Sequence, residues 1–280
     1  MDYSILINTC DNYSDIWPVF FEIFKRTWTA EVPAIFLNTE KKHYQDNDLQ
    51  ITCLNLDKGI NNAPWGKRLI KALEQVPHEY VLMLLEDFLF EQEIRTERIE
   101  SCCRYLENDL SIAAFQLTPN GEFEKGIFPE EEERYKGFSK RRKGDLFTVV
   151  AGPTLWRKSD LLRLTKTSDN PWEWEFFGSF RTILYGKDIY GWRSKNDCIF
   201  KYDVDHGGAI HRGKWVGYKM HELEKKYDIK IDYGDREIVE DWMKMDEYTK
   251  PVPWFKRMGS IIKNRTMMIT NTLYGLKCRF

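Results

Sequence analysis

Residues 65–90 read WGKRLIKALEQVPHEYVLMLLEDFLF, and this stretch decides the fold. A short basic helix leads into an apolar run at residues 80–85. Because that run does not alternate, it predicts a strand covered on both faces, as in a mostly parallel sheet between two layers of helices. The strand ends on Glu86 and Asp87, where sheets of this kind bind ligands, so the pair is a candidate divalent-cation site. The alternative is a strand that simply leaves the core and meets water.

Strands and helices alternate through the first two thirds of the chain. The hydrophobic pattern predicts strands at 3–7, 34–37, 51–54, 80–85, 112–117 and 147–151, and helices at 14–28, 65–75, 94–107, 158–165 and from 170 onward. This order predicts an α/β fold, in which helices flank a Rossmann-like, mostly parallel sheet.

The regular pattern stops at a charged insertion, residues 118–146. An acidic run at 130–133 is followed there by a basic run at 140–143. Such an insertion is either a mobile lid or a solvated loop, and the charge runs favour the solvated loop. We expect residues 1–215 to form the main domain and residues 216–280 to form a helical C-terminal extension.

Composition narrows the function classes. A net charge of -2 gives no reason to expect a nucleic-acid partner, and the 15% aromatic content favours a surface that stacks on rings, sugars included. The six cysteines form no C-x-x-C pair, which indicates free thiols in a reducing compartment. The chain enters its first strand without a basic leader or a long apolar segment, so a cytoplasmic location is expected.

Residues 250–280 contain seven Lys and Arg residues and no acidic residue. Aromatic and aliphatic side chains are interleaved with these charges. Basic charge beside apolar bulk attracts an anionic membrane surface, so the segment predicts peripheral contact with the inner face of the cell membrane. The alternative is an amphipathic helix that packs on the main domain and leaves its basic face in water.

The order of these parts resembles the nucleotide-sugar-binding half of a GT-A-type glycosyltransferase. In that family a helix with a basic residue precedes a buried strand that ends on an acidic motif, as Lys67 and Arg68 precede Glu86 and Asp87 here. The closest likeness is to bacterial transferases of capsule and lipopolysaccharide gene clusters, and it extends to about Trp215. The resemblance implies transfer of a sugar from a nucleotide-sugar, a UDP-sugar before other donors, to a hydroxyl of a saccharide or lipid-linked saccharide. It also implies Mn²⁺ or Mg²⁺ as cofactor.

The acidic motif differs from the D-x-D of that family, because Glu86-Asp87-Phe88 lacks the second aspartate. Asp87 is therefore the expected metal ligand. The resemblance adds His211, in the glycine-rich stretch 207–215, as a late metal or diphosphate contact. A structural role is the alternative for a lone histidine.

The resemblance also places the donor against the loops that follow the first three strands. Acidic groups there are expected to hydrogen-bond base and ribose, with basic groups near the phosphates. The expected donor contacts are Thr9, Asp11, Tyr13, Glu40, Asp57, Lys67, Arg68, Glu86, Asp87, His211 and Arg212. Each of the loop residues has an ordinary turn role as its alternative.

The cluster Trp172-Glu173-Trp174-Glu175 opens a helix and contains both candidate catalytic bases. Transfer to a hydroxyl needs a general base, and the resemblance implies a carboxylate from a helix start in this region. Residues two apart on a helix point about 200° away from each other, so the two glutamates cannot face one acceptor. Glu173 fits a capping box with Asn170, which leaves Glu175 as the preferred base. The tryptophans are expected to stack on an acceptor sugar or, alternatively, to pack the helix against the sheet.

Two other functions stay open. A sugar nucleotidyltransferase shares this kind of sheet but needs a glycine-rich phosphate loop after the first strand, where residues 9–13 read TCDNY. A non-catalytic saccharide-binding or assembly protein would keep the fold without the activity, and the incomplete acidic motif favours that alternative.

Overall fold

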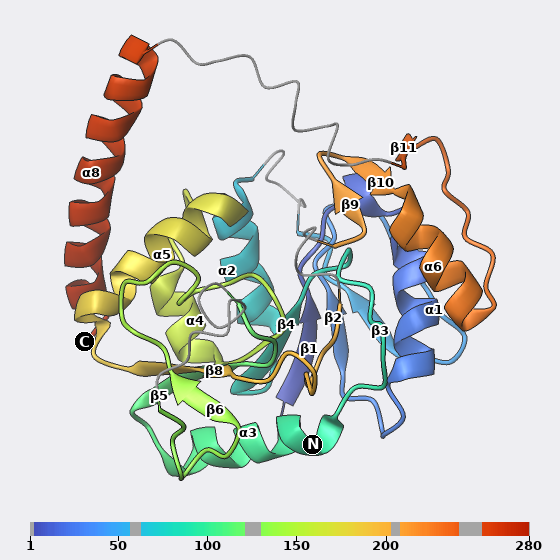
Figure 1. Ribbon diagram of the computed structural model, residues 1–280, viewed down its shortest axis with the longest axis horizontal. Helices are drawn as coiled ribbons and strands as arrows, with labels where there is room; N and C mark the ends of the chain where they lie inside the picture. The colour runs from blue at the N-terminus through green and yellow to red at the C-terminus, as the bar shows by residue number, and fades with distance from the viewer. Residues whose placement is uncertain (1–2, 57–62, 121–129, 203–207, 241–253, 280) are drawn as a thin grey trace.

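The structure, a computed structural model, describes residues 3–56, 63–120, 130–202, 208–240 and 254–279, with side chains of the last range from 263 onward. Its centre is an eight-stranded sheet (Figure 1) made of β1 Tyr3–Ile7, β2 Ile35–Leu37, β3 Ile51–Cys53, β4 Tyr80–Leu84, β5 Ile112–Gln116, β6 Phe138–Lys140, β7 Thr154–Arg157 and β8 Asp188–Trp192. The spatial order is β3-β2-β1-β4-β7-β5-β8-β6. The pairs among β3, β2, β1 and β4 are parallel, whereas β7 and β6 run antiparallel to their neighbours. The mostly parallel α/β sheet expected from the sequence is confirmed.

Helices cover both faces of this sheet. One face carries α1 (Trp17–Thr27), α3 (Thr96–Asn108) and α6 (Gly217–Tyr227), and the other carries α2 (Trp65–Gln75), α4 (Lys158–Leu164) and α5 (Pro171–Tyr185). Successive side chains of β4 point to opposite faces of the sheet. Leu82 and Leu84 belong to the hydrophobic core that includes α1, whereas Val81 and Met83 belong to the core that includes α2. The non-alternating apolar run therefore predicted this strand correctly.

The prediction of a strand at residues 147–151 is wrong, because the strand in this region is β7, at Thr154–Arg157. Residues 147–151 form an irregular segment, exposed at Phe147 and buried from Thr148 to Ala151, whose backbone groups are bonded by side chains. Gln116 Nε2 donates to the carbonyls of Phe147 (2.9 Å) and Thr148 (3.0 Å), and the N–H of Val149 donates to Ser179 Oγ (3.1 Å). These partners satisfy the backbone without a strand ladder, which the apolar pattern could not reveal.

Part of the charged insertion belongs to the sheet. Residues 138–140 form the edge strand β6, and the buried Arg141 donates to the carbonyls of Asn120 (2.9 Å) and Leu146 (3.1 Å). The solvated-loop interpretation is thus wrong for residues 138–141, although Glu130, Glu131 and Glu133 are exposed.

The C-terminal part adds a small sheet and a long helix. β9 (Ile210–His211), β10 (Lys214–Val216) and β11 (Ile238–Val239) form the sheet, and α8 (Trp254–Lys277) packs against α5 at the flank of the molecule (Figure 1). All six cysteines are free thiols. Within the described residues, no helix has both the length and the apolarity needed to span a membrane.

Candidate functional site

The loops that follow β1, β2 and β4 meet at one edge of the sheet. The N–H of Asn8 donates to the carbonyl of Leu84 (2.8 Å), and the N–H of Asn38 donates to the carbonyl of Ile7 (3.0 Å). The Asn38 side-chain amide also donates to Asn8 Oδ1 (2.6 Å), and both side chains are buried. This is the edge at which open α/β sheets bind ligands, and polar groups line it.

Asp11 ties the first two of these loops together. Its backbone N–H donates to Glu40 Oε2 (2.7 Å), while its carboxylate accepts from the N–H groups of Glu40, Lys41 and Lys42, each at 2.9 Å. The carboxylate is thus occupied by backbone donors, so Asp11 shapes the site more than it offers a free oxygen. Asp57, the expected contact after β3, lies outside the described residues.

Arg68 comes from α2 and reaches the same edge while buried. One guanidinium nitrogen pairs with Glu40 Oε1, and another donates to the carbonyl of Thr9 (3.4 Å). The Thr9 hydroxyl in turn accepts from Trp17 Nε1 (2.9 Å). Lys67, the residue before it on α2, is only partly buried, so Arg68 is the buried cation that α2 supplies to this edge.

Glu86 and Asp87 follow β4 as two adjacent carboxylates. Burial raises the pKa of the Glu86 carboxyl, and the charge of Asp87 raises that pKa further, whereas Thr9 and Arg68 lower it. Burial also raises the pKa of Asp87. Burial raises the pKa of the Tyr13 hydroxyl, and the charges of Asp87 and then Glu86 raise it further. Two adjacent carboxylates are therefore held where a cation would stabilise them.

The β9–β10 hairpin sits on the backbone of this pair. The N–H of Ala209 donates to the carbonyl of Asp87 (2.7 Å). Gly208 has a φ of +98°, and a Cβ there would lie 2.7 Å from the carbonyl oxygen of Asp87 and 3.0 Å from the ring of Phe88. The close approach therefore requires glycine. It brings β9, which ends on His211, to the edge that carries the acidic pair.

Gly208→Ala is expected to weaken both the fold and the docking of the hairpin on the backbone of Asp87. The hairpin turn supplies a matched control, because Gly213 also has a positive φ (+78°) but no atom lies within 4 Å of its Cβ position, and Arg212 beside it turns at φ +49°. Gly213→Ala should cost about 1 kcal/mol of stability from backbone strain alone. Gly208→Ala should cost more, because the added Cβ also meets the carbonyl oxygen of Asp87, and chemical denaturation of both variants measures the difference. Equal effects of the two variants would contradict the close approach.

Glu175 reaches the same edge from α5. Its Oε1 accepts from the N–H of Ala151 (2.8 Å), and burial raises its pKa while that hydrogen bond lowers it. Gly152 follows, with its Cβ position 3.1 Å from the hydroxyl of Tyr202 and 3.7 Å from the ring of Phe88. The Phe88 and Tyr202 rings stack at 4.3 Å. Glu175 and the acidic pair are thus linked through one continuous set of packed residues.

The two tryptophans at the start of α5 differ in their exposure to solvent. Trp174 is fully buried, its indole N–H donates to Thr165 Oγ1 (3.1 Å), and its ring lies between two further indole rings. It packs the helix against the sheet and cannot stack on an acceptor. Trp172 is 77% exposed, so its ring is accessible for stacking on a sugar. Asn170 caps the helix by accepting from the N–H of Glu173 (2.8 Å), as the capping interpretation expected.

Arg236, which sequence reasoning missed, clamps the loop after β1 to the hairpin. It makes a bidentate pair with Asp15 (2.7 and 2.8 Å) and donates to the carbonyls of Asn12 and Gly213, both at 2.8 Å. Its guanidinium also lies 4.9 Å from the ring centre of Tyr13. Arg236 stands in a polar segment without periodicity, so no sequence signal indicates this role.

Arg236→Ala is expected to lower the free energy of unfolding by about 2 kcal/mol, the usual value of hydrogen bonds to a charged group. Arg236→Lys keeps the charge but cannot form the bidentate pair, so it should recover only part of the loss. Thermal unfolding measured on both variants checks this. Full recovery by lysine would contradict the clamp.

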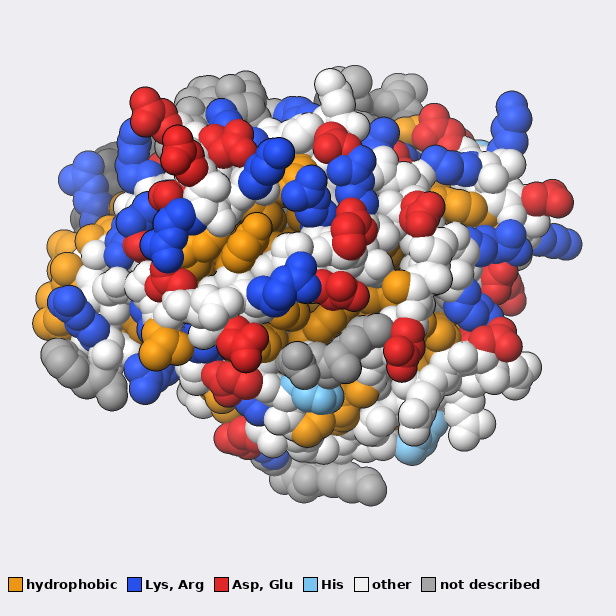
Figure 2. All heavy atoms as spheres, turned by 90° about the horizontal axis from the view of Figure 1, so that it is seen from below, with side chains coloured by type: hydrophobic (Ala, Val, Ile, Leu, Met, Phe, Trp, Pro, Cys, Tyr) orange, Lys and Arg blue, Asp and Glu red, His pale blue; other side chains and the backbone are white. Residues whose placement is uncertain are grey.

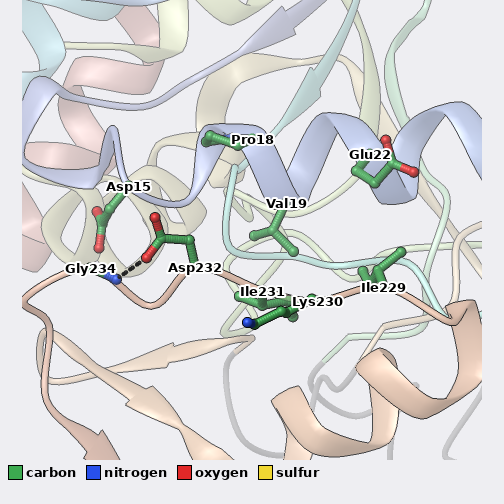
Figure 3. A pocket seen from close by; sticks show the side chains of 9 residues that line it. All are labelled: Asp15, Pro18, Val19, Glu22, Ile229, Lys230, Ile231, Asp232 and Gly234. Atoms are coloured by element: carbon green, nitrogen blue, oxygen red, sulfur yellow. Dashed lines mark hydrogen bonds between the residues drawn. The ribbon is translucent and has the colours of Figure 1, made fainter.

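A separate groove of about 370 Å³ lies between α1 and residues 229–234 (Figure 3). Pro18 and Val19 line it from α1, and Ile229 and Ile231 line it from the facing segment. Asp15 is the residue it shares with the Arg236 clamp. Neither the acidic pair nor Glu175 lines this groove.

The acidic pair supplies only part of a metal site. Among the described residues, no group of three or more His, Cys, Asp or Glu side chains is placed to hold a metal ion. Glu86 and Asp87 offer the oxygen ligands that Mg²⁺ and Mn²⁺ prefer, and a donor's phosphates would supply others. The residues present therefore fit a cation that is bound together with the donor.

Comparisons with known proteins give a limited set of likenesses. No protein-family model and no curated protein matches the chain. S. aureus TarS 1–349 in complex with UDP-GlcNAc is similar with a TM-score of 0.45 and 12% identity, over 70% of this chain and 57% of that one. Mannosyl-3-phosphoglycerate synthase from Rubrobacter xylanophilus is similar with a TM-score of 0.32 and 11% identity, over 57% of this chain and 55% of that one.

CMP:2-keto-3-deoxy-manno-octonic acid synthetase complexed with CTP has a TM-score of 0.37 and 12% identity, over 69% of this chain and 89% of that one. The chain spans less than two thirds of the TarS structures it matches. At these identities and TM-scores the likenesses identify no reaction, so the function has to come from the site itself.

Proposed function

We propose that this chain is a glycosyltransferase of surface-polysaccharide synthesis, capsule or lipopolysaccharide. It binds a nucleotide-sugar, with a UDP-sugar as the first donor to test, and transfers the sugar to a hydroxyl of a saccharide or lipid-linked saccharide. The observation that carries the proposal is the series of contacts that joins the acidic pair, with Glu86 buried and Asp87 half-buried, to the Glu175 carboxylate through Phe88, Gly152 and Ala151.

The donor half of the site is the edge after β1, β2 and β4. Tyr13 and Glu40 would face base and ribose, while Arg68 adds positive charge near the acidic pair. Asp87, with Glu86, would hold a divalent cation shared with the diphosphate, which would offset negative charge on the leaving nucleotide. His211 lies on the hairpin that approaches Asp87 and is the further candidate ligand.

Glu175 is the proposed general base. Its carboxylate takes the proton from the acceptor hydroxyl as that oxygen bonds to the anomeric carbon, and the bond from the anomeric carbon to the phosphate oxygen breaks. A raised pKa makes a carboxylate a stronger base once it is ionised, and burial supplies that shift here. The exposed Trp172, at the start of the same helix, offers a ring on which an acceptor sugar can stack.

A donor panel tests the proposal. Purified protein should bind at least one nucleotide-sugar and hydrolyse it slowly without an acceptor, with a faster rate in Mn²⁺ than in EDTA. Neither binding nor hydrolysis across UDP-, GDP-, CMP- and dTDP-sugars would overturn it. Release of pyrophosphate from a nucleoside triphosphate and a sugar would instead identify a nucleotidyltransferase.

A further inference from the structure

The outward face of α8 carries an apolar stripe. Ile269, Leu273 and Leu276 are 62%, 56% and 43% exposed. Their spacing of four and then three residues places them within about 60° of one another around the helix. Figure 2 shows hydrophobic side chains gathered at its left edge, the side on which α8 lies. An exposed stripe of this kind marks an interaction surface more often than a single exposed leucine does.

The opposite face of α8 is fixed against the protein, so the stripe cannot turn inward. Asn271 is buried, and its Oδ1 accepts from Arg181 Nε (2.8 Å) and from Lys166 Nζ (2.7 Å). Gly275 approaches α5 so closely that a Cβ there would lie 1.9 Å from the carbonyl oxygen of Arg181. Cys278 Sγ donates to the carbonyl of Arg163 (2.9 Å). Asn271 and Gly275 of α8, together with Cys278 just after it, hold one rotation of the helix.

Positive charge surrounds the stripe. Lys263, Arg265, Lys277 and Arg279 are all exposed, and residues 248–280 contain no acidic residue. On an α-helix, Arg265 lies about 40° from Ile269 and Lys277 about 80° from it, on opposite sides of the stripe. Long basic side chains at the edges of an apolar stripe can reach lipid phosphates while the stripe enters the interface.

We propose that the outward face of α8 docks on the surface of an anionic lipid bilayer, with the helix lying in the interface. Charge complementarity favours an anionic bilayer over a second copy of the chain as the binding partner of this face. A symmetric dimer contact would bring two basic α8 helices together, and α8 carries no acidic residue to pair with them. The proposal goes beyond glycosyl transfer and does not depend on it.

Vesicle co-sedimentation tests the surface with two triple variants and one control variant of the full chain. Wild-type protein should bind phosphatidylcholine vesicles that contain about 30% phosphatidylglycerol, and it should bind pure phosphatidylcholine far more weakly. Ile269→Ser, Leu273→Ser and Leu276→Ser together should weaken that binding by about tenfold or more. Lys263→Gln, Arg265→Gln and Lys277→Gln together should remove the preference for anionic vesicles, a loss of about 100-fold. Leu110→Ser, which replaces a 70% exposed leucine after α3, should leave binding unchanged.

Three results would overturn the proposal: no binding of wild-type protein to the anionic vesicles at low salt, undiminished binding of both triple variants, or a dimer in light scattering that the serine variant abolishes. Thermal unfolding checks that each variant stays folded. Donor hydrolysis of the same variants should match wild type, so a failure of vesicle binding would leave the transferase proposal to its own donor panel.

Discussion

Glu175→Gln is expected to lower turnover of donor and acceptor by about 10²–10⁴-fold while donor affinity stays unchanged. Glutamine has the same size and can still accept a hydrogen bond from the N–H of Ala151, so the loop before β7 should keep its position. It cannot take a proton from a hydroxyl. Steady-state kinetics, with donor binding measured by calorimetry, separates the two effects.

Glu173→Gln is the informative companion, because both glutamates are catalytic candidates. Glu173 belongs to the first turn of α5, where Asn170 caps its backbone N–H. Its substitution should cost far less activity than that of Glu175. A collapse of activity in the Glu173 variant with little effect in the Glu175 variant would reverse the assignment of the base.

The pH dependence of stability gives a second readout for Glu175. Burial raises its pKa in the folded state above the unfolded value. Its contribution to stability is therefore fully present below the unfolded pKa and is lost as the pH rises through the folded pKa. Glutamine is neutral throughout, so the variant should be more stable than wild type at about pH 8, and the difference should disappear towards about pH 4. A variant less stable at high pH would indicate a structural carboxylate.

Asp87→Asn is expected to lower turnover by about 100-fold and to remove the effect of Mn²⁺ on UDP binding. The neutral amide keeps the shape of the side chain but removes the charge on which a cation shared with the diphosphate depends, and such a cation supplies several kcal/mol. The backbone carbonyl that accepts from Ala209 stays in place, so the β9–β10 hairpin should remain docked.

Glu107→Gln, an exposed carboxylate-to-amide change on α3, controls for the loss of one negative charge. Turnover with and without Mn²⁺, measured for both variants, makes the comparison. Metal-dependent UDP binding that survives in the Asp87 variant would show that the cation lies elsewhere.

The sheet could be predicted because its signal is local. Residues 80–85 are apolar without alternation, and that pattern alone predicts a strand buried on both faces with carboxylates at its end. The segment at 147–151 misled the same reasoning. Its apolar residues from Val149 to Ala151 are buried, but its backbone bonds to Gln116, Ser179 and Glu175 instead of a neighbouring strand.

The site was harder to predict because its contacts cross long stretches of sequence. Arg236 pairs with Asp15 over 221 residues, and neither position shows a pattern that indicates the other. Trp174 and Trp172 are two residues apart and have the same chemistry, yet one is fully buried and the other exposed. Which face of a helix start meets the sheet is decided by tertiary packing and not by residue type.

Diffraction from crystals soaked with UDP and Mn²⁺ tests the central claim most directly. We expect diphosphate density at the edge after β1 and β4, with an anomalous manganese peak within ligand distance of Asp87. Nucleotide density in the groove between α1 and residues 229–234, or no density at saturating UDP, would contradict the assignment of the donor site to the Glu86–Asp87 edge.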